Sequence, residues 1–172
     1  MTPAQRELLE DYEVAAIDRD ELLRRFGVDL AQAPEFVRGE VEAALASGDA
    51  DAADLAIELV FLAGGLSGGL GRYVDLLGRL VVSTGHRQHQ HCVMALQTLR
   101  DPRALPYLRD ALAMGFAYLE YTCSESQAIA KWFSHALAAI GGDEAIALLR
   151  TYAASEDPGI AAEMRYRLGR LG

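Results

Sequence analysis

A short helical pattern recurs 41 residues further along this chain. Ala95–Leu99 has the sequence Ala-Leu-x-x-Leu, and Ala136–Ile140 has Ala-Leu-x-x-Ile in the same register. Leu168 and Leu171 repeat Leu137 and Ile140 at an offset of 31, and the longer offset reflects roughly ten extra residues around 115–123. A helical hairpin of about thirty residues cannot bury its apolar face alone. The pattern therefore predicts stacked helical hairpins.

The remaining sequence is also typical of helices. No segment alternates apolar and polar residues with a period of two, so we expect an all-α protein without a sheet. Asp20 is the expected N-cap of one helix, Pro106 is expected to bend another, and the glycine-rich stretch 64–71 is expected to connect two helices. Helices are predicted over residues 3–16, 21–26, 35–47, from 50 toward 63, 72–82, 86–100, 102–114, 124–140, 142–154 and 157–171.

Charge is distributed unevenly along the chain. Its 172 residues carry a net charge of −9, yet the first 60 hold 15 acidic and 5 basic residues, and the rest hold 10 acidic and 11 basic. Nucleic-acid binding needs many Lys and Arg contacts to phosphate, so it is not expected. The acidic first third would suit a basic protein partner through electrostatic complementarity, or it is simply a solvated surface.

Other bulk features point to a cytoplasmic protein. No apolar run is long enough to cross a membrane, and the first residues have no secretory apolar core. Cys92 and Cys123 are isolated in the sequence, which is typical of a reducing compartment. We expect no membrane association and no cofactor, and the oligomeric state is open.

Asp101-Pro102 entering a helix and Ala-Leu-x-x-Leu/Ile-Gly ending one resemble HEAT-like repeats of the phycobilisome-lyase type. The resemblance covers residues 70–172 and extends toward 49. It implies a short right-handed α-solenoid of HEAT-like hairpins over residues 49–172. Residues 1–48 would then be an N-terminal helical cap within the same compact unit.

In such solenoids the second helix of each hairpin lines the inner side. Register places Cys92, Phe133 and Met164 in the core between hairpins, and a second stripe on the opposite side. That stripe contains Trp, Tyr and Met, which are enriched at protein interfaces, although Trp132 could equally be ordinary core. The aromatic insert before residue 124 could rim the same surface. The candidate partner-binding residues are His91, Met94, Trp132, His135, Glu163, Tyr166, Tyr118 and Tyr121.

Three alternatives involve chemistry. His86, His89 and Cys92 have a helical spacing that could hold zinc, but the sequence shows no complete metal-ligand motif. Cys123, Ser124, Ser126 and His135 are close in sequence but lack a nucleophile motif. The glycine-rich stretch lacks the Lys-Ser/Thr of a phosphate loop.

The favoured hypothesis is a non-enzymatic protein-binding module. The His-rich start before Ala95–Ala104 is similar to bacterial immunity proteins that neutralise polymorphic toxins, which implies a basic toxin domain as partner. The alternatives are a cytoplasmic scaffold or adaptor, or a metal- or tetrapyrrole-linked enzyme of lyase type.

Overall fold

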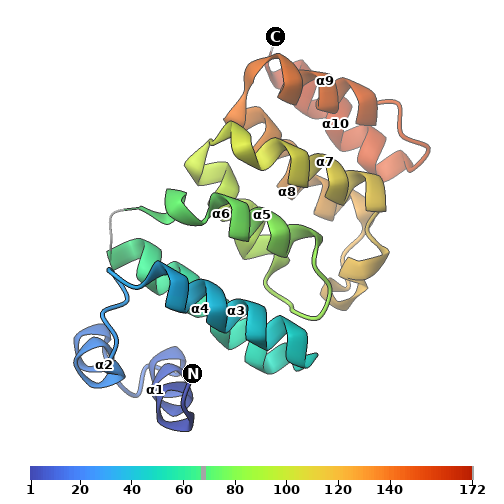
Figure 1. Cartoon of the computed structure of the whole chain (residues 1–172). Helices are drawn as coiled ribbons and strands as arrows, with labels where there is room; N and C mark the ends of the chain where they lie inside the picture. Colours follow the sequence, from blue (N-terminus) through green and yellow to red (C-terminus); the bar gives the residue numbers. More distant parts are fainter. Residues whose placement is uncertain (67–68, 172) are drawn as a thin grey trace. The chain divides into compact units, whose positions relative to one another are not determined.

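The computed structural model describes residues 1–66 and 69–171 (Figure 1). The chain divides into two compact units, Met1–Leu70 and Gly71–Gly172. Within the described residues all regular structure is helical, which confirms the all-α prediction. No described helix has both the length and the apolar character needed to cross a membrane.

The described residues of the first unit form four α-helices, whose ends follow local sequence signals. They are α1 (Pro3–Glu13), α2 (Arg19–Phe26), α3 (Pro34–Ser47) and α4 (Ala50–Leu66). The α2 helix starts two residues earlier than predicted, because the side chain of Asp18, rather than Asp20, accepts the backbone N–H of Glu21 at 2.8 Å. Gly48 ends α3 in the left-handed conformation, as its sequence position predicts.

The helix α4 continues further than the glycine-rich sequence suggests. Gly64 and Gly65 belong to its last turn, so the prediction that the whole stretch 64–71 is a connection was wrong for these residues. A Cβ on Gly64 would lie 2.5 Å from Leu70 Cδ1, so the absence of a side chain allows this close return of the chain. Ser67 and Gly68 lie outside the described residues.

The second unit consists of three helical hairpins. The 3₁₀ turn η1 (Leu70–Tyr73) leads into α5 (Val74–Val82) and α6 (His89–Leu99). The next hairpin has η2 (Pro102–Ala104), α7 (Leu105–Met114), η3 (Ala117–Thr122) and α8 (Ser126–Ile140). The last has α9 (Gly142–Tyr152) and α10 (Pro158–Leu171). Every α-helix of this unit falls within its predicted range, whereas η3 lies in the insert for which no helix was predicted.

These hairpins stack in two layers. Contacts join α5 to α7 and α7 to α9 in one layer, and α6 to α8 and α8 to α10 in the other. Cys92, Phe133 and Met164 are fully buried, as the repeat register predicts. The α6–α8–α10 layer therefore has a packed side facing α5, α7 and α9, and an opposite side on which the repeat register predicts the candidate residues.

Prolines and aspartates mark the starts of η2, α7 and α10 in the second unit. The side chain of Asp157 accepts the backbone N–H groups of Gly159 and Ile160, and Asp101 accepts that of Arg103. Pro106 lies in the first turn of α7, where its missing N–H has no helical partner to lose. The predicted helix is divided at this point into η2 and α7, and the bend expected at Pro106 stays a prediction.

The predicted division separates an N-terminal cap over residues 1–48 from repeats over 49–172. It depends on which helices are related as repeats, and the two compact units do not test that relationship. Both this division and the right-handedness of the array stay predictions.

Candidate functional site

Five of the residues predicted to bind a partner lie on α6, α8 and α10, and the repeat register predicts that they share the outward side of this layer. We call this surface the α6–α8–α10 face and define it by His91, Met94, Trp132, His135 and Tyr166. Met94 is 51% exposed and Tyr166 is 60% exposed, which is unusual for large apolar side chains in a folded domain. His91 is exposed, and Trp132 and His135 are half-buried. The helices thus present aromatic and sulfur-containing side chains to solvent.

Glu163, the sixth predicted residue on these helices, lies beneath this surface. It is only 5% exposed, and its carboxylate accepts a 2.6 Å hydrogen bond from the Ser134 hydroxyl of α8. Arg167, one turn along α10, donates to the same carboxylate at 3.2 Å and to the Ser134 oxygen at 3.3 Å. Glu163 therefore positions α8 against α10 rather than facing solvent. The Glu-x-x-x-Arg spacing was the sequence signal that could have revealed this pair.

The electrostatic surroundings of His135 come from this same network. Burial lowers the pKa of His135 below its usual value, and the positive charges of Arg167 and Lys131 lower it further, while Glu163 acts in the opposite direction. The lowered pKa favours the neutral form of the His135 imidazole. The guanidinium of Arg167 also lies 5.8 Å from the centre of the Tyr166 ring.

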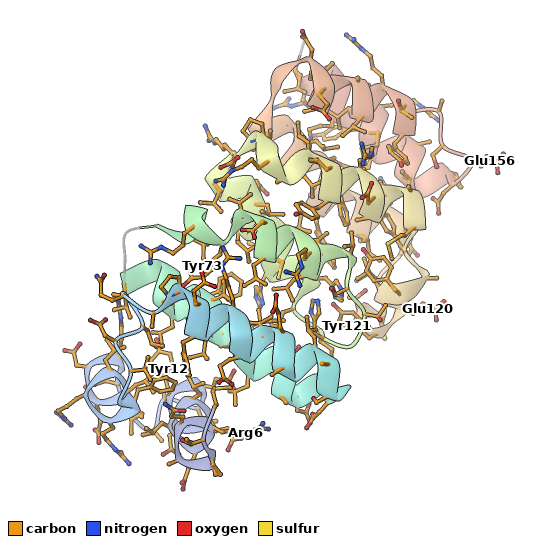
Figure 2. All side chains as sticks on the ribbon, viewed as in Figure 1. Arg6, Tyr12, Tyr73, Glu120, Tyr121 and Glu156 are labelled. Carbon is orange, nitrogen blue, oxygen red and sulfur yellow. The ribbon has the colours of Figure 1, made fainter. Side chains whose placement is uncertain are left out.

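A second cluster joins the loop before α6 to η3. The rings of His86 and His89 are stacked 4.0 Å apart, and the ring of Tyr118 meets His89 edge-on at 5.2 Å. The hydroxyl of Tyr121 lies 2.8 Å from His89 Nδ1, and that of Tyr118 donates to the carbonyl of Val81 at 2.9 Å. Figure 2 shows Tyr121 beside this loop. The two tyrosines predicted to rim the binding surface thus make structural contacts; their role toward a partner stays a prediction.

The same contacts bear on the proposed metal ligands. His86 Nε2 lies 2.8 Å from the Leu80 carbonyl, and His86 Nδ1 accepts the backbone N–H of Gln88 at 3.1 Å. His89 Nε2 lies 2.7 Å from the carbonyl of Ser83. Both rings therefore use both nitrogens in hydrogen bonds, and zinc would have to displace them. Within residues 1–66 and 69–171, no three His, Cys, Asp or Glu side chains come together as a metal site.

The candidate nucleophiles have structural contacts of their own. The hydroxyl of Ser126 donates to the Asp157 side chain at 2.8 Å and joins the starts of α8 and α10. The Ser124 hydroxyl donates to the Thr122 carbonyl, and the Cys123 thiol lies 3.9 Å from the Tyr121 carbonyl. Cys123 and Ser124 thus contact carbonyl groups of their local turn, and Ser126 contacts the residue that caps α10.

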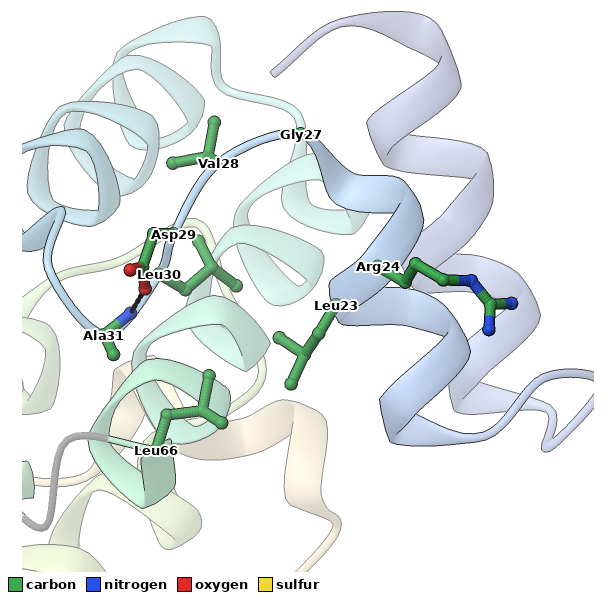
Figure 3. A pocket seen from close by; sticks show the side chains of 8 residues that line it. All are labelled: Leu23, Arg24, Gly27, Val28, Asp29, Leu30, Ala31 and Leu66. Atoms are coloured by element: carbon green, nitrogen blue, oxygen red, sulfur yellow. Dashed lines mark hydrogen bonds between the residues drawn. The ribbon is translucent and has the colours of Figure 1, made fainter.

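The first unit contains a hollow between α2, the following loop and the end of α4. It measures about 340 Å³, and Leu23, Leu30 and Leu66 give it a mainly apolar lining (Figure 3). Asp29 accepts the Ala31 backbone N–H at 3.1 Å, which holds the loop in a turn, and Arg24 points away from the hollow (Figure 3). No polar group in this lining identifies a ligand.

Negative charge dominates the surface of this unit. Met1–Leu70 holds 15 acidic and 5 basic residues, a net charge of −10, whereas the second unit has +1. Burial raises the pKa of Glu13, and the nearby carboxylates of Asp54 and Glu10 raise it further. The carboxylates are thus close enough to repel one another.

Comparison with known families identifies one repeat directly. Residues 90–114 match the family model of the PBS lyase HEAT-like repeat. The chain contains a HEAT-like repeat. The matched segment extends from α6 to the end of α7, which joins the second helix of one hairpin to the first helix of the next. No curated protein and no solved structure matches the chain.

Proposed function

We propose that this protein is a non-enzymatic protein-binding module and that the α6–α8–α10 face contacts the partner. The observation that carries the proposal is the row of Met94, Trp132 and Tyr166 across three stacked HEAT-like helices, with Met94 and Tyr166 mostly exposed. Exposed apolar side chains of these types, supported by a rigid packed layer, are typical of interaction surfaces.

Photo-crosslinking tests this assignment. A photoreactive phenylalanine analogue replaces Met94 on α6 or, as a matched control, Met114 at the end of α7. Both methionines are 51% exposed, so intrinsic accessibility is equal. We expect a specific adduct in the native host from position 94 and none from position 114. Equal adducts at both positions, or none at 94, would contradict the assignment of this face.

We also propose a more specific role, neutralisation of a basic toxin domain. The acidic first unit supports this role, because a surface of net charge −10 accelerates encounter with a basic partner. The test is co-expression with the product of any toxin-like gene encoded beside this one. Growth should be restored only when both proteins are made, and purified toxin should form a stable complex with this protein. Failure of rescue would remove the toxin role while leaving protein binding in place.

A further inference from the structure

The two layers of the second unit differ in charge. The helices α6, α8 and α10, all within the described residues, carry four basic side chains and one acidic side chain. The helices α5, α7 and α9 carry three basic and four acidic side chains. Although the net charge of the unit is only +1, its α6–α8–α10 layer is positive. The basic side chains of this layer are Lys131, Arg165, Arg167 and Arg170, and its acidic side chain is Glu163.

The single carboxylate of the positive layer does not reach the surface. Glu163 is buried, accepts the Ser134 hydroxyl and pairs with Arg167. Arg165 points elsewhere, because its guanidinium donates to the Ala153 carbonyl at the end of α9 at 2.9 Å. The α6–α8–α10 face is therefore flanked by exposed cations without an exposed anion from these three helices.

These cations lie among the apolar side chains of the face. Lys131 is exposed, precedes Trp132 and lies one helical turn before His135, whose pKa responds to its charge. Arg170 is exposed one turn after Tyr166. A ligand lying across α8 and α10 would meet aromatic surface with positive charge at both positions.

We propose that the α6–α8–α10 face binds an acidic peptide segment that also carries aromatic or aliphatic side chains. The carboxylates of that segment would pair with Lys131 and Arg170, and its apolar side chains would cover Met94, Trp132 and Tyr166. This inference rests on the proposed protein-binding function and names the chemistry of the segment bound at this face. Charge complementarity is its basis, because acidic groups are attracted here and basic ones are repelled.

Selection from a random peptide library tests the proposal while the natural partner is still unidentified. The full-length protein is immobilised, bound 12-residue peptides are sequenced, and the charge of the enriched pool is compared with the input. We expect enrichment of Asp and Glu together with Phe, Trp or Leu. A pool without charge preference, or one enriched in Lys and Arg, would overturn the proposal.

Charge reversal locates the site. Lys131→Glu and Arg170→Glu should each weaken binding of a selected acidic peptide by about fivefold, because an attraction becomes a repulsion. Arg150→Glu on α9 is the matched control, since it makes the same change in net charge at an exposed position of the other layer and should leave affinity unchanged. Equal weakening by all three variants would indicate a non-specific charge effect and contradict the proposal. Circular dichroism verifies that each variant is folded.

Two further outcomes distinguish this proposal from self-association and from partner binding that does not use Lys131 and Arg170. If the acidic first unit of a second copy occupies the face, the protein should dimerise and Lys131→Glu should return it to a monomer in sedimentation; that result would replace the peptide as occupant. If crosslinking at position 94 captures a partner whose affinity ignores Lys131 and Arg170, the binding function stands and the acidic-segment inference fails.

Discussion

The side chain of Glu163 is a carboxylate buried inside the α8–α10 contact. Its charge is tolerated there because Arg167 and the Ser134 hydroxyl both contact Oε1. Removing the partner of a buried charge is more destabilising than removing both charges, because the remaining ion is left without compensation.

Arg167→Met should therefore lower the free energy of unfolding by about 3 kcal/mol. The double variant Glu163→Gln, Arg167→Met should recover much of that loss, because a neutral amide still hydrogen-bonds to Ser134. Urea titrations followed by circular dichroism measure both values. If the loss of unfolding free energy in the double variant equals the sum of the losses in the two single variants, the two side chains are not energetically coupled.

The imidazole of His135 provides a pH-dependent test at the same scale. Its pKa lies below the usual value, so the unfolded chain binds a proton more readily than the folded one. The contribution of this residue to stability is therefore present above pH of about 6.5 and is lost as the pH falls through the folded pKa.

Proton NMR of the His135 ring should report this titration directly. Lys131→Gln should raise the pKa of His135, because it removes one of the positive charges acting on the ring. Lys131→Arg keeps the charge and should leave the titration unchanged. A shift of equal size in both variants would assign the effect to packing rather than charge.

Between elements, α5 and α7 approach each other closely at Gly78. A Cβ on Gly78 would lie 2.2 Å from Cδ2 of the Tyr107 ring, so glycine is required where these two helices meet. Gly169 in α10 has no atom within 4 Å of such a Cβ.

Gly78→Ala should lower the free energy of unfolding by about 1–3 kcal/mol, because Tyr107 must move out of its packed position. Gly169→Ala should be neutral or raise it by up to about 1 kcal/mol, since alanine favours the helix and nothing opposes it. Thermal unfolding of the two variants gives the comparison. Similar destabilisation by both would contradict the close α5–α7 contact.

The contact between η3 and α5 depends on the hydroxyl of Tyr118. Burial, followed by the neighbouring Tyr121, raises the pKa of Tyr118 to about 12, and its hydroxyl donates to the Val81 carbonyl. A phenol with a raised pKa contributes stability below its unfolded pKa of about 10 that is lost as the pH rises toward the folded value.

Ultraviolet titration should therefore include a transition from Tyr118 about two pH units later than that of a free phenol, in addition to the late ionisation of other buried phenols such as Tyr152. Tyr118→Phe should remove that late transition and leave the remaining tyrosines unchanged. Persistence of the late transition in this variant would assign it to another residue.

Repeat register made the elements of the second unit predictable, because Cys92, Phe133 and Met164 are the packing residues and packing residues are what the repeats share. The differences from the predicted helix boundaries arose where neighbouring residues offered alternative helix starts. Pro106 was expected to bend a helix, but the preceding 3₁₀ turn placed it in a first turn, and Asp18 outcompeted Asp20 as N-cap. The spacing of Glu163 and Arg167 on α10 could have indicated their ion pair, but the contact of this pair with Ser134 of α8 could not be deduced from register, because it depends on which side chains turn inward.

Across the whole molecule, charge follows the division into units. All of the net negative charge belongs to Met1–Leu70, while the HEAT-like hairpins carry +1. Under the two proposals made above, the protein attracts a basic partner through one unit and an acidic segment through the other.

Ionic strength should separate these two interactions. Association with a basic toxin domain should slow by about tenfold or more between about 50 mM and about 500 mM salt, because screening shortens the reach of the first unit's field. Stopped-flow mixing measures the rate constant, and the dissociation rate serves as internal control because it should change much less. A salt-independent association rate would argue against electrostatic steering by this unit.

The two thiols of the chain differ completely in exposure. Cys92 is fully buried between the helices of the second unit, and Cys123 is exposed at the turn before α8. A maleimide dye should therefore label the native protein at one site without mutagenesis, adjacent to the helix that carries Trp132. Cys92 should react later, at a rate that reports how often the core opens. Without mutation, the protein therefore offers one thiol for labelling near the proposed binding surface and one whose labelling rate measures unfolding.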